Sequence, residues 1–202
     1  MLQTLLVLAG AYLLGSIPFS YLVARRWGVA DVRKVGSGNV GATNVMRSAG
    51  RVPGLLAFAL DAGKGAAAAL LASRLDSGGW TPPLAAAAAV LGHMYPVWLR
   101  FKGGKGVATG AGAFLPLAPL AAAGGIATFV ATLAATRYVS VGSIAGAIAL
   151  PIFALLTARP APIVSSSAAI AALVVWKHRG NLARITRGTE SRLGRPARAG
   201  QP

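Results

Sequence analysis

The sequence predicts an all-α integral membrane protein with seven transmembrane helices, an outside N-terminus and a cytoplasmic C-terminus. Hydrophobic residues make up 55% of the 202 residues and charged residues only 12%, whereas soluble domains contain about 25% charged residues. Long uncharged stretches alternate with short basic ones. This composition excludes an ordinary water-soluble enzyme, and it also excludes a disordered chain, which needs low hydrophobicity and high charge.

A membrane span needs about 20 mostly apolar residues. The first such stretch has no basic n-region, so we expect a retained span instead of a cleaved signal peptide. The predicted spans are 2–24, 52–73, 81–99, 106–118, 120–136, 139–157 and 160–176.

The uncharged stretch 106–136 needs a decision between one crossing and two. As a single straight helix it would be about 46 Å long, against a hydrocarbon core of about 30 Å. Pro116 and Pro119 lie near its middle, and glycines follow at 124 and 125. Since proline breaks helices, two short crossings are favoured.

The distribution of lysine and arginine supports the same choice. Seven spans place seventeen of these residues inside and two, Arg74 and Arg159, outside. A single crossing at 106–136 would give about ten inside and nine outside, which the positive-inside rule disfavours. The predicted cytoplasmic parts of this single membrane domain are the loops 25–51, 100–105 and 137–138 and the tail 177–202.

The remaining composition limits the chemistry. The formal net charge is +16, a basic excess typical of proteins that bind anionic lipids, anionic substrates or nucleic acid. The absence of cysteine excludes disulfides, thiolate catalysis and cysteine metal sites. Two histidines and four carboxylates are too few for a dedicated metal site to be expected, and we predict neither a metal nor a cofactor.

The first cytoplasmic loop contains the pattern Gly36-x-Gly38-x-x-Gly41. It matches the dinucleotide-binding fingerprint, but it follows a predicted membrane helix where that fingerprint requires a strand. Glycines still let backbone N–H groups approach an anion, and Arg47 offers a bidentate phosphate contact. Neutral hydrogen-bonding groups are added by Ser37, Asn39, Thr43 and Asn44. We favour an anion site over a flexible basic connector.

The second cytoplasmic loop reads Lys102-Gly103-Gly104-Lys105-Gly106. It lacks the spacing of a Walker A loop. Two functions are possible for this loop: a basic membrane anchor or a phosphate-binding cradle. The glycines around the lysines favour the cradle, because they bring backbone N–H groups close to an anion.

Ionisable residues elsewhere are the next candidates. Asp61 and Lys64 stand three residues apart in a predicted span, so they can meet on one helix face, and we weigh a functional role evenly against a structural pair. We expect His93 to be a buried, satisfied side chain. We expect His178, near Asn181 at the membrane exit, to face a phosphate. The tail arginines beyond Arg187 are expected to contact anionic lipid.

From these residues alone, two classes of function remain. One is a lipid-modifying enzyme at the membrane surface, and the other is an organophosphate transporter. A transporter is expected to show internal repeats with broken helices at the midplane, and the two halves show no convincing repeat. Nucleic-acid binding is disfavoured, because the loops lack interleaved aromatic residues.

At its polar motifs the sequence resembles the bacterial acyl-phosphate:glycerol-3-phosphate acyltransferase family of the PlsY type. The matching segments are GSIPFSYLVAR (15–25), GSGNVGATNVMR (36–47), LDAGKG (60–65), GHMYPVWLRFKGGKGVAT (92–109) and HRGNLARITRGTE (178–190). Many members carry proline where this chain has Val40. The valine slightly loosens that turn and touches no reactive group.

The resemblance implies transfer of a fatty acyl group from acyl phosphate to the 1-hydroxyl of glycerol 3-phosphate. The products would be lysophosphatidic acid and phosphate, in the first step of phospholipid biosynthesis. It also implies a seven-span protein of the bacterial inner membrane with a cytoplasmic active site. The partners would be glycerol 3-phosphate, acyl phosphate and membrane lipids, without nucleic acid, and we expect a monomer.

Carried over by motif, four residues would be catalytic: Ser37, Arg47, His178 and Asn181. Substrate would be bound by Gly38, Asn39, Gly41, Asn44, Lys102, Gly103, Gly104, Lys105, Gly106, Thr109 and Ser143. Glu190 would be structural.

The chain lacks the His-x-x-x-x-Asp motif of other glycerolipid acyltransferases, since neither His93 nor His178 has an aspartate five positions later. We therefore expect direct transfer without a His–Asp dyad. An acyl phosphate carries a good leaving group, so positioning and charge stabilisation can supply much of the catalysis. The proton would pass to the donor phosphate or to His178.

Overall fold

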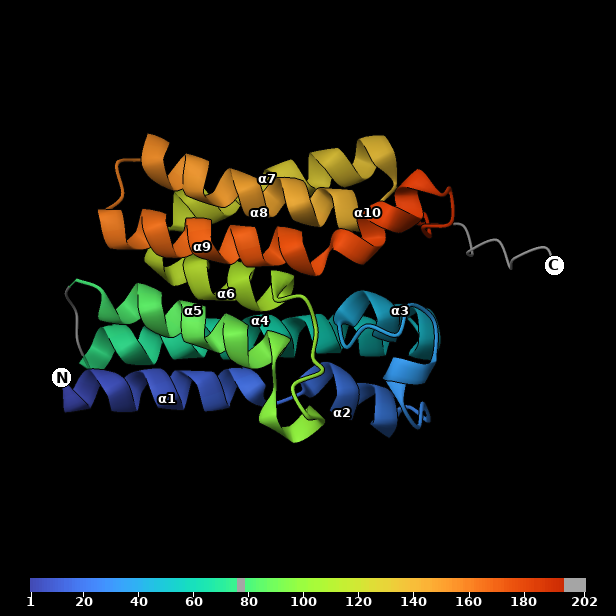
Figure 1. Cartoon of the computed structure of the whole chain (residues 1–202), viewed down its shortest axis with the longest axis horizontal. Helices are drawn as coiled ribbons and strands as arrows, with labels where there is room; N and C mark the ends of the chain where they lie inside the picture. The colour runs from blue at the N-terminus through green and yellow to red at the C-terminus, as the bar shows by residue number, and fades with distance from the viewer. Residues whose placement is uncertain (76–78, 195–202) are drawn as a thin grey trace. The chain divides into compact units, whose positions relative to one another are not determined.

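The computed structural model describes residues 1–75 and 79–194, and within these ranges every regular element is a helix (Figure 1). The helices form two compact units, Met1–Pro119 and a second that begins at Leu120. The all-helical prediction is confirmed, and the prediction of one membrane domain stays a prediction.

The first unit is built around its longest helix, α4. Its helices are α1 (Leu2–Ser16), α2 (Phe19–Arg26), α3 (Ala42–Ala49), α4 (Arg51–Leu75), α5 (Thr81–Met94) and α6 (Val107–Leu117), with short 3₁₀ turns η1 (Val32–Lys34) and η2 (Val97–Leu99). All of the other α-helices of this unit pack against α4, and α1 also packs along α5.

Small residues allow these helices to approach closely. A Cβ on Gly15 of α1 would lie 2.1 Å from the carbonyl oxygen of Ala89 in α5. In the same way, a Cβ on Gly65 of α4 would lie 2.1 Å from the carbonyl oxygen of Thr109 in α6. Backbone-to-backbone packing of this kind is typical of membrane helices, where small residues replace the hydrophobic drive that water provides elsewhere.

Two predicted spans end or break earlier than expected. The stretch 2–24 divides at Ile17–Pro18 into α1 and α2, because proline has no N–H to continue the helical ladder. The stretch 81–99 is α-helical only to Met94. Its next residue, Tyr95, precedes Pro96, and the residue before a proline disfavours the helical conformation.

The second unit contains α7 (Pro119–Thr136), α8 (Val139–Leu156), α9 (Ala161–Lys177) and α10 (Arg179–Thr186). The uncharged stretch 106–136 thus forms two helices, α6 and α7, that are separated by Ala118. α8 packs against α9, and α9 and α10 meet at His178 with a bend of 46°.

Four described helical segments are long and apolar enough to cross a membrane: Leu2–Arg26, Arg51–Leu75, Pro119–Thr136 and Val139–Leu156. The bent pair α9–α10 gives a fifth if it counts as one span. Seven spans and the sidedness of the termini stay predictions.

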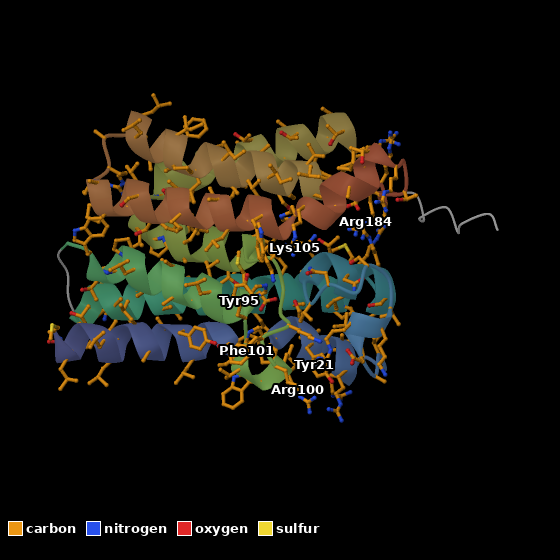
Figure 2. All side chains as sticks on the ribbon, viewed as in Figure 1. Tyr21, Tyr95, Arg100, Phe101, Lys105 and Arg184 are labelled. Carbon is orange, nitrogen blue, oxygen red and sulfur yellow. The ribbon has the colours of Figure 1, made fainter. Side chains whose placement is uncertain are left out.

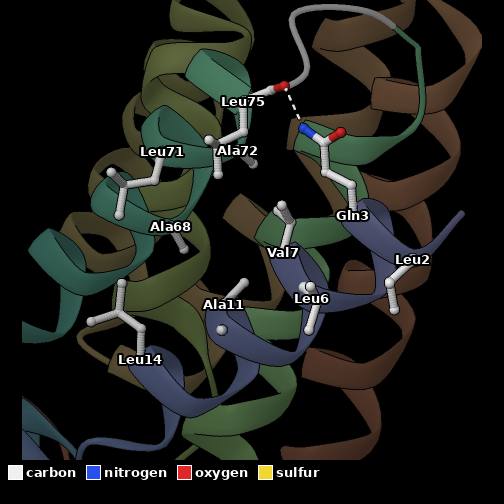
Figure 3. A pocket seen from close by; sticks show the side chains of 11 residues that line it. Leu2, Gln3, Leu6, Val7, Ala11, Leu14, Ala68, Leu71, Ala72 and Leu75 are labelled. Carbon is white, nitrogen blue, oxygen red and sulfur yellow. Dashed lines mark hydrogen bonds between the residues drawn. The ribbon is translucent and has the colours of Figure 1, made fainter.

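An apolar groove of about 610 Å³ lies between α1 and α4 (Figure 3). Its walls include Leu6 and Leu14 of α1 and Leu71 of α4. Near one end, the side chain of Gln3 donates a hydrogen bond to the carbonyl oxygen of Leu75 (3.1 Å).

Candidate active site

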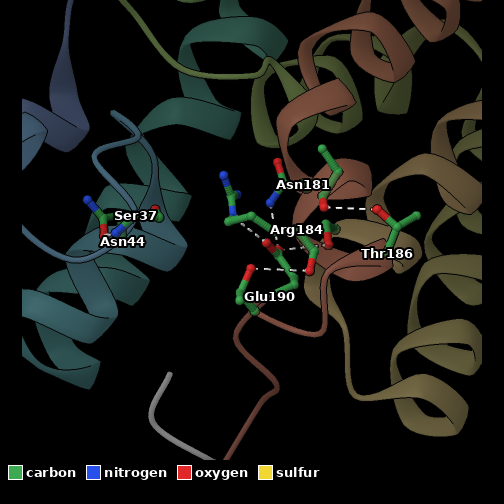
Figure 4. Close-up of polar contacts among 9 residues, drawn as sticks. Ser37, Asn44, Asn181, Arg184, Thr186 and Glu190 are labelled. Atoms are coloured by element: carbon green, nitrogen blue, oxygen red, sulfur yellow. Dashed lines mark hydrogen bonds and ion pairs between the residues drawn. The ribbon is translucent and has the colours of Figure 1, made fainter. Parts of the chain in front are cut away.

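The first glycine-rich segment is organised by one buried amide, that of Asn44 in α3 (Figure 4). Its Oδ1 accepts a hydrogen bond from the backbone N–H of Ser37 at 2.9 Å. Its Nδ2 donates to the carbonyl oxygens of Val32 (2.9 Å), Val35 (3.1 Å) and Asn39 (3.1 Å). Predicted as a substrate-binding residue, Asn44 is only 1% exposed and its amide is engaged within the loop.

The entrance to this loop is fixed by an exposed ion pair. Asp31 accepts hydrogen bonds from the backbone and the guanidinium of Arg33 at 2.9 Å. The side-chain hydrogen bond from Arg33 lowers the pKa of Asp31 to about 2. The loop beyond this pair presents Ser37 and Gly38 to the surface, and the side chain of Arg47 in α3 is exposed as well.

The second glycine-rich segment is anchored to the end of α5. The backbone N–H of Gly103 donates to the carbonyl oxygen of Met94 (3.2 Å), and that of Gly104 donates to the carbonyl oxygen of His93 (3.1 Å). A Cβ on Gly104 would lie 2.2 Å from His93 Nε2 and 2.4 Å from the carbonyl oxygen of Val40. Since Val40 belongs to the first loop, the two glycine-rich segments meet at Gly104.

Of the two lysines of this segment, Lys102 is exposed. Lys105 is half-buried (Figure 2). Gly106 adopts the left-handed backbone conformation (φ 80°) and precedes α6. The segment therefore leads into a helix N-terminus, which is favourable for anions. Thr109 is fully buried one turn later, and its hydroxyl has no hydrogen-bond partner among the described residues.

Beneath the two loops lies a buried polar cluster. Lys64 Nζ is 2.8 Å from Asp61 Oδ1 and also donates to the carbonyl oxygen of Ile17 (2.8 Å). Ser20 Oγ donates to Asp61 Oδ2 (2.5 Å), and His93 Nδ1 lies 3.4 Å from Asp61 Oδ1. The predicted pairing of Asp61 with Lys64 and the burial of His93 are confirmed.

The structure thus contains a His–Asp pair, although the sequence has no His-x-x-x-x-Asp motif. Thirty-two positions separate Asp61 from His93, so no local sequence pattern marks the pair. Its histidine ring is only 6% exposed and packs against Gly104.

In the second unit, His178 occupies the bend between α9 and α10 and is 3% exposed. Its Nδ1 lies 2.7 Å from the carbonyl oxygen of Val174. A carbonyl oxygen only accepts, so Nδ1 carries the proton and Nε2 is the basic nitrogen of the neutral ring. The backbone carbonyl thereby fixes the tautomer of the neutral ring.

Glu190 accepts hydrogen bonds from side chains of two helices of the second unit, α8 and α10 (Figure 4). It accepts hydrogen bonds from Asn181 Nδ2 (2.6 Å), Arg184 Nε (2.8 Å) and Ser140 Oγ (3.0 Å). Burial by itself raises the pKa of Glu190, but the three hydrogen bonds outweigh it and the pKa is lowered. The carboxylate thus joins α8 to α10, and its assignment as a structural residue stays a prediction.

The predicted site residues therefore fall in two groups. The first unit joins the Ser37 loop to the segment that carries Lys105, and the second places Asn181 one helical turn after His178. Ser143, also in the second unit, is buried and donates to the carbonyl oxygen of Val139 (2.8 Å). Of the tail arginines predicted to contact lipid, Arg192 lies over the ring of Tyr138, 4.9 Å from its centroid. Those at positions 195 and 198 lie outside the described residues.

Known proteins resemble the chain over nearly its whole length. The family model described as "Glycerol-3-phosphate acyltransferase" matches residues 5–188. A protein of that name from Desulforamulus reducens is 45% identical over 96% of both chains, and one from Rubrobacter xylanophilus is 47% identical over 96% of both.

Solved structures agree. The crystal structure of PlsY, an integral membrane glycerol 3-phosphate acyltransferase, in its glycerol 3-phosphate form has a TM-score of 0.90 and 41% identity, covering 95% of this chain and 96% of that one. Its lysophosphatidic acid form has a TM-score of 0.88 and 40% identity, covering 95% of both chains. The family model matches most of the chain, and the relatives are more than 30% identical to it. This multi-pass membrane protein therefore belongs to the glycerol-3-phosphate acyltransferase family of the PlsY type.

Proposed function

We propose that this protein transfers a fatty acyl group from acyl phosphate to the 1-hydroxyl of glycerol 3-phosphate, giving lysophosphatidic acid and inorganic phosphate. The observation that carries the proposal is the match, over 95% of the chain, to a PlsY structure in its glycerol 3-phosphate form. The reaction would be the first step of phospholipid biosynthesis.

The glycine-rich segments of the first unit suit the binding of phosphate-bearing substrates. Two anionic substrates repel each other, and cationic side chains together with backbone N–H groups offset that repulsion. We assign the glycerol 3-phosphate cradle to Gly103, Gly104, Gly106 and Lys105, at the N-terminus of α6. Arg47 adds a second cation.

Other predicted substrate-binding residues support the cradle in different ways. We propose that Gly38, Asn39 and Gly41 shape the loop next to the substrate, with Asn44 holding that loop from behind. Lys102 draws anions to the segment. Thr109 and Ser143 are both buried, and we keep them as proposed substrate-binding residues.

The chemical step is a direct acyl transfer. The 1-hydroxyl oxygen of glycerol 3-phosphate attacks the carbonyl carbon of the acyl phosphate. The bond between that carbon and the bridging phosphate oxygen then breaks, and inorganic phosphate leaves with the bonding pair. Ser37 and Asn181 stabilise the developing oxyanion by hydrogen bonding.

The proton of the hydroxyl passes to His178 Nε2. We base this assignment on the hydrogen bond from Nδ1 to the carbonyl oxygen of Val174. Because Nδ1 carries the proton in that bond, Nε2 is the nitrogen that accepts one. The buried pair of Asp61 and His93 takes no part in proton transfer. The acyl chain lies between membrane helices, so the donor reaches the site from the bilayer.

We further propose seven crossings of the bacterial inner membrane, with the N-terminus outside and the site facing the cytoplasm. Seventeen of the twenty lysines and arginines would then be inside. We also propose that the protein acts as a monomer.

The test is an assay of purified, detergent-solubilised protein with acyl phosphate, acyl-CoA and acyl carrier protein donors side by side. We expect lysophosphatidic acid with acyl phosphate alone. Activity with acyl-CoA alone would overturn the proposed donor. Uptake of glycerol 3-phosphate into vesicles without acylation would favour a transporter.

A further inference from the structure

Two opposite charges are buried inside the first unit without a role in the proposed reaction. The side chains of Asp61 and Lys64 are 2% and 1% exposed. Burying both charges between helices costs free energy. A protein with an apolar pair of similar volume in their place is often as stable or more stable. Ionisable groups at membrane depth therefore call for a functional explanation.

The pair lies where α1 gives way to α2. Lys64 donates to the carbonyl oxygen of Ile17, next to the proline that breaks the helix. Asp61 accepts from Ser20, in the first turn of α2. The two charges thus fix the break, from which α2 leads to the first glycine-rich loop.

His93 connects this pair to the second loop. One side of its ring, Nδ1, faces Asp61 at 3.4 Å. The other side, Nε2, packs so tightly on Gly104 that a methyl group there would come within 2.2 Å of it. The backbone carbonyl of the same residue accepts the N–H of Gly104 at 3.1 Å. Ring and backbone of His93 together therefore determine where Gly104 lies.

Val40 of the first loop lies with Asp61, Lys64 and His93 around one narrow void. The carbonyl oxygen of Val40 would be 2.4 Å from a Cβ on Gly104, so the glycine is held between the two loops. A shift of the ring would move Gly104 and, through Val40, the loop that carries Ser37.

We propose that Asp61 and His93 are positioning residues that hold Gly104 and the KGGKG segment in the shape that binds glycerol 3-phosphate. Lys64 balances the charge of Asp61 and secures the helix break. The ring of His93 is covered by Gly104, so it acts through the loop and does not touch the substrate. The inference rests on the proposed function, since it assigns this segment to glycerol 3-phosphate.

The test compares His93→Ala with the conservative His93→Asn, whose amide nitrogen can take the place of Nδ1 facing Asp61. Binding of glycerol 3-phosphate is measured by calorimetry without a donor, and kcat and KM are measured with acyl phosphate. The matched control is Ser73→Ala, which removes a hydroxyl of α4 bonded to its own helix at Ala69.

For His93→Ala we expect the Kd and KM for glycerol 3-phosphate to rise about tenfold or more, with kcat lowered less than about threefold. His93→Asn should recover binding to within about threefold of wild type, and Ser73→Ala should match wild type. The KM for acyl phosphate should stay unchanged in all three variants.

Two results would overturn the inference. A loss of about 10²–10⁴ in kcat at unchanged KM would make His93 a proton-transfer residue. Wild-type binding in His93→Ala would show that the ring does not position the loop. Calorimetry needs no donor, so a wild-type protein that binds glycerol 3-phosphate but acylates nothing would sink the proposed function alone.

If His93→Ala fails to fold, the double variant Asp61→Leu with Lys64→Met decides the question. It buries no charge, so folding is retained while the contact to His93 is lost. A rise in KM for glycerol 3-phosphate of about tenfold is expected, and an unchanged KM would contradict the inference.

Discussion

The backbone N–H of Ser37 donates to the side-chain Oδ1 of Asn44, 2.9 Å away and seven residues later in the chain. The same amide donates to three backbone carbonyls of the loop. The position of Ser37 is therefore set by a buried side chain in α3, which explains how a segment rich in glycine keeps a defined shape.

Replacing Asn44 should damage the loop through its backbone. Asn44→Ala leaves three carbonyls and one N–H without their partner, and each buried group left unpaired costs about 1–3 kcal/mol. We expect lower thermal stability and a KM for glycerol 3-phosphate raised about tenfold or more, measured by initial rates. Gln3→Ala, which removes a peripheral amide bonded to Leu75, is the control, and equal kinetics in both variants would contradict this role.

Gly104 should tolerate no side chain. In Gly104→Ala the new methyl group would meet His93 Nε2 at 2.2 Å and the carbonyl oxygen of Val40 at 2.4 Å. One of these is a backbone atom, so the loops must separate, and we expect KM for glycerol 3-phosphate to rise about tenfold or more. Gly63→Ala in α4 is the matched control, because a Cβ there meets nothing within 4 Å. It should be neutral or stabilise the protein by about 0.5–1 kcal/mol.

His178→Gln tests the assignment of the base. Glutamine keeps a polar group near Nε2 but does not accept a proton at neutral pH, so kcat should fall by about 10²–10⁴ with little change in KM. Steady-state kinetics with acyl phosphate measure both constants. A mild binding defect with kcat preserved would instead assign the proton to the donor phosphate.

Glu190 gives the stability a defined pH dependence. Its pKa is lowered in the folded state, so its contribution is complete above the ordinary glutamate value of about 4.5 and is lost as the pH falls through the lowered value. Glu190→Gln should cost about 1–3 kcal/mol at pH 7. The melting temperature of this variant should also fall less than that of wild type between pH 7 and pH 3. Parallel falls in both proteins would exclude this carboxylate as a source of the pH dependence.

Much of the helical content could be predicted from the sequence, because long apolar stretches have few alternatives to helix in a bilayer. The division of 106–136 at its prolines follows from local chemistry in the same way. The break at Pro18 was missed because the stretch 2–24 contains no charge to mark it, and the end of α5 at Met94 was missed although Pro96 stands two residues later.

The site shows a similar limit. The glycine patterns locate the two loops, because the residues that form each loop are consecutive in the sequence. The contacts of His93 with Asp61 and of Gly104 with Val40 join residues far apart in the chain, and no local pattern encodes them. Asn44 illustrates the remaining difficulty, because an asparagine that binds a ligand and one that binds its own backbone look alike in sequence.

The measurement that bears most directly on the central claim is an experimental structure of this protein with glycerol 3-phosphate bound. The account predicts that the phosphate lies against the segment Gly103–Gly106, beside the side chain of Lys105. A glycerol 3-phosphate bound away from this segment, with the two glycine-rich loops unchanged and empty, would contradict it.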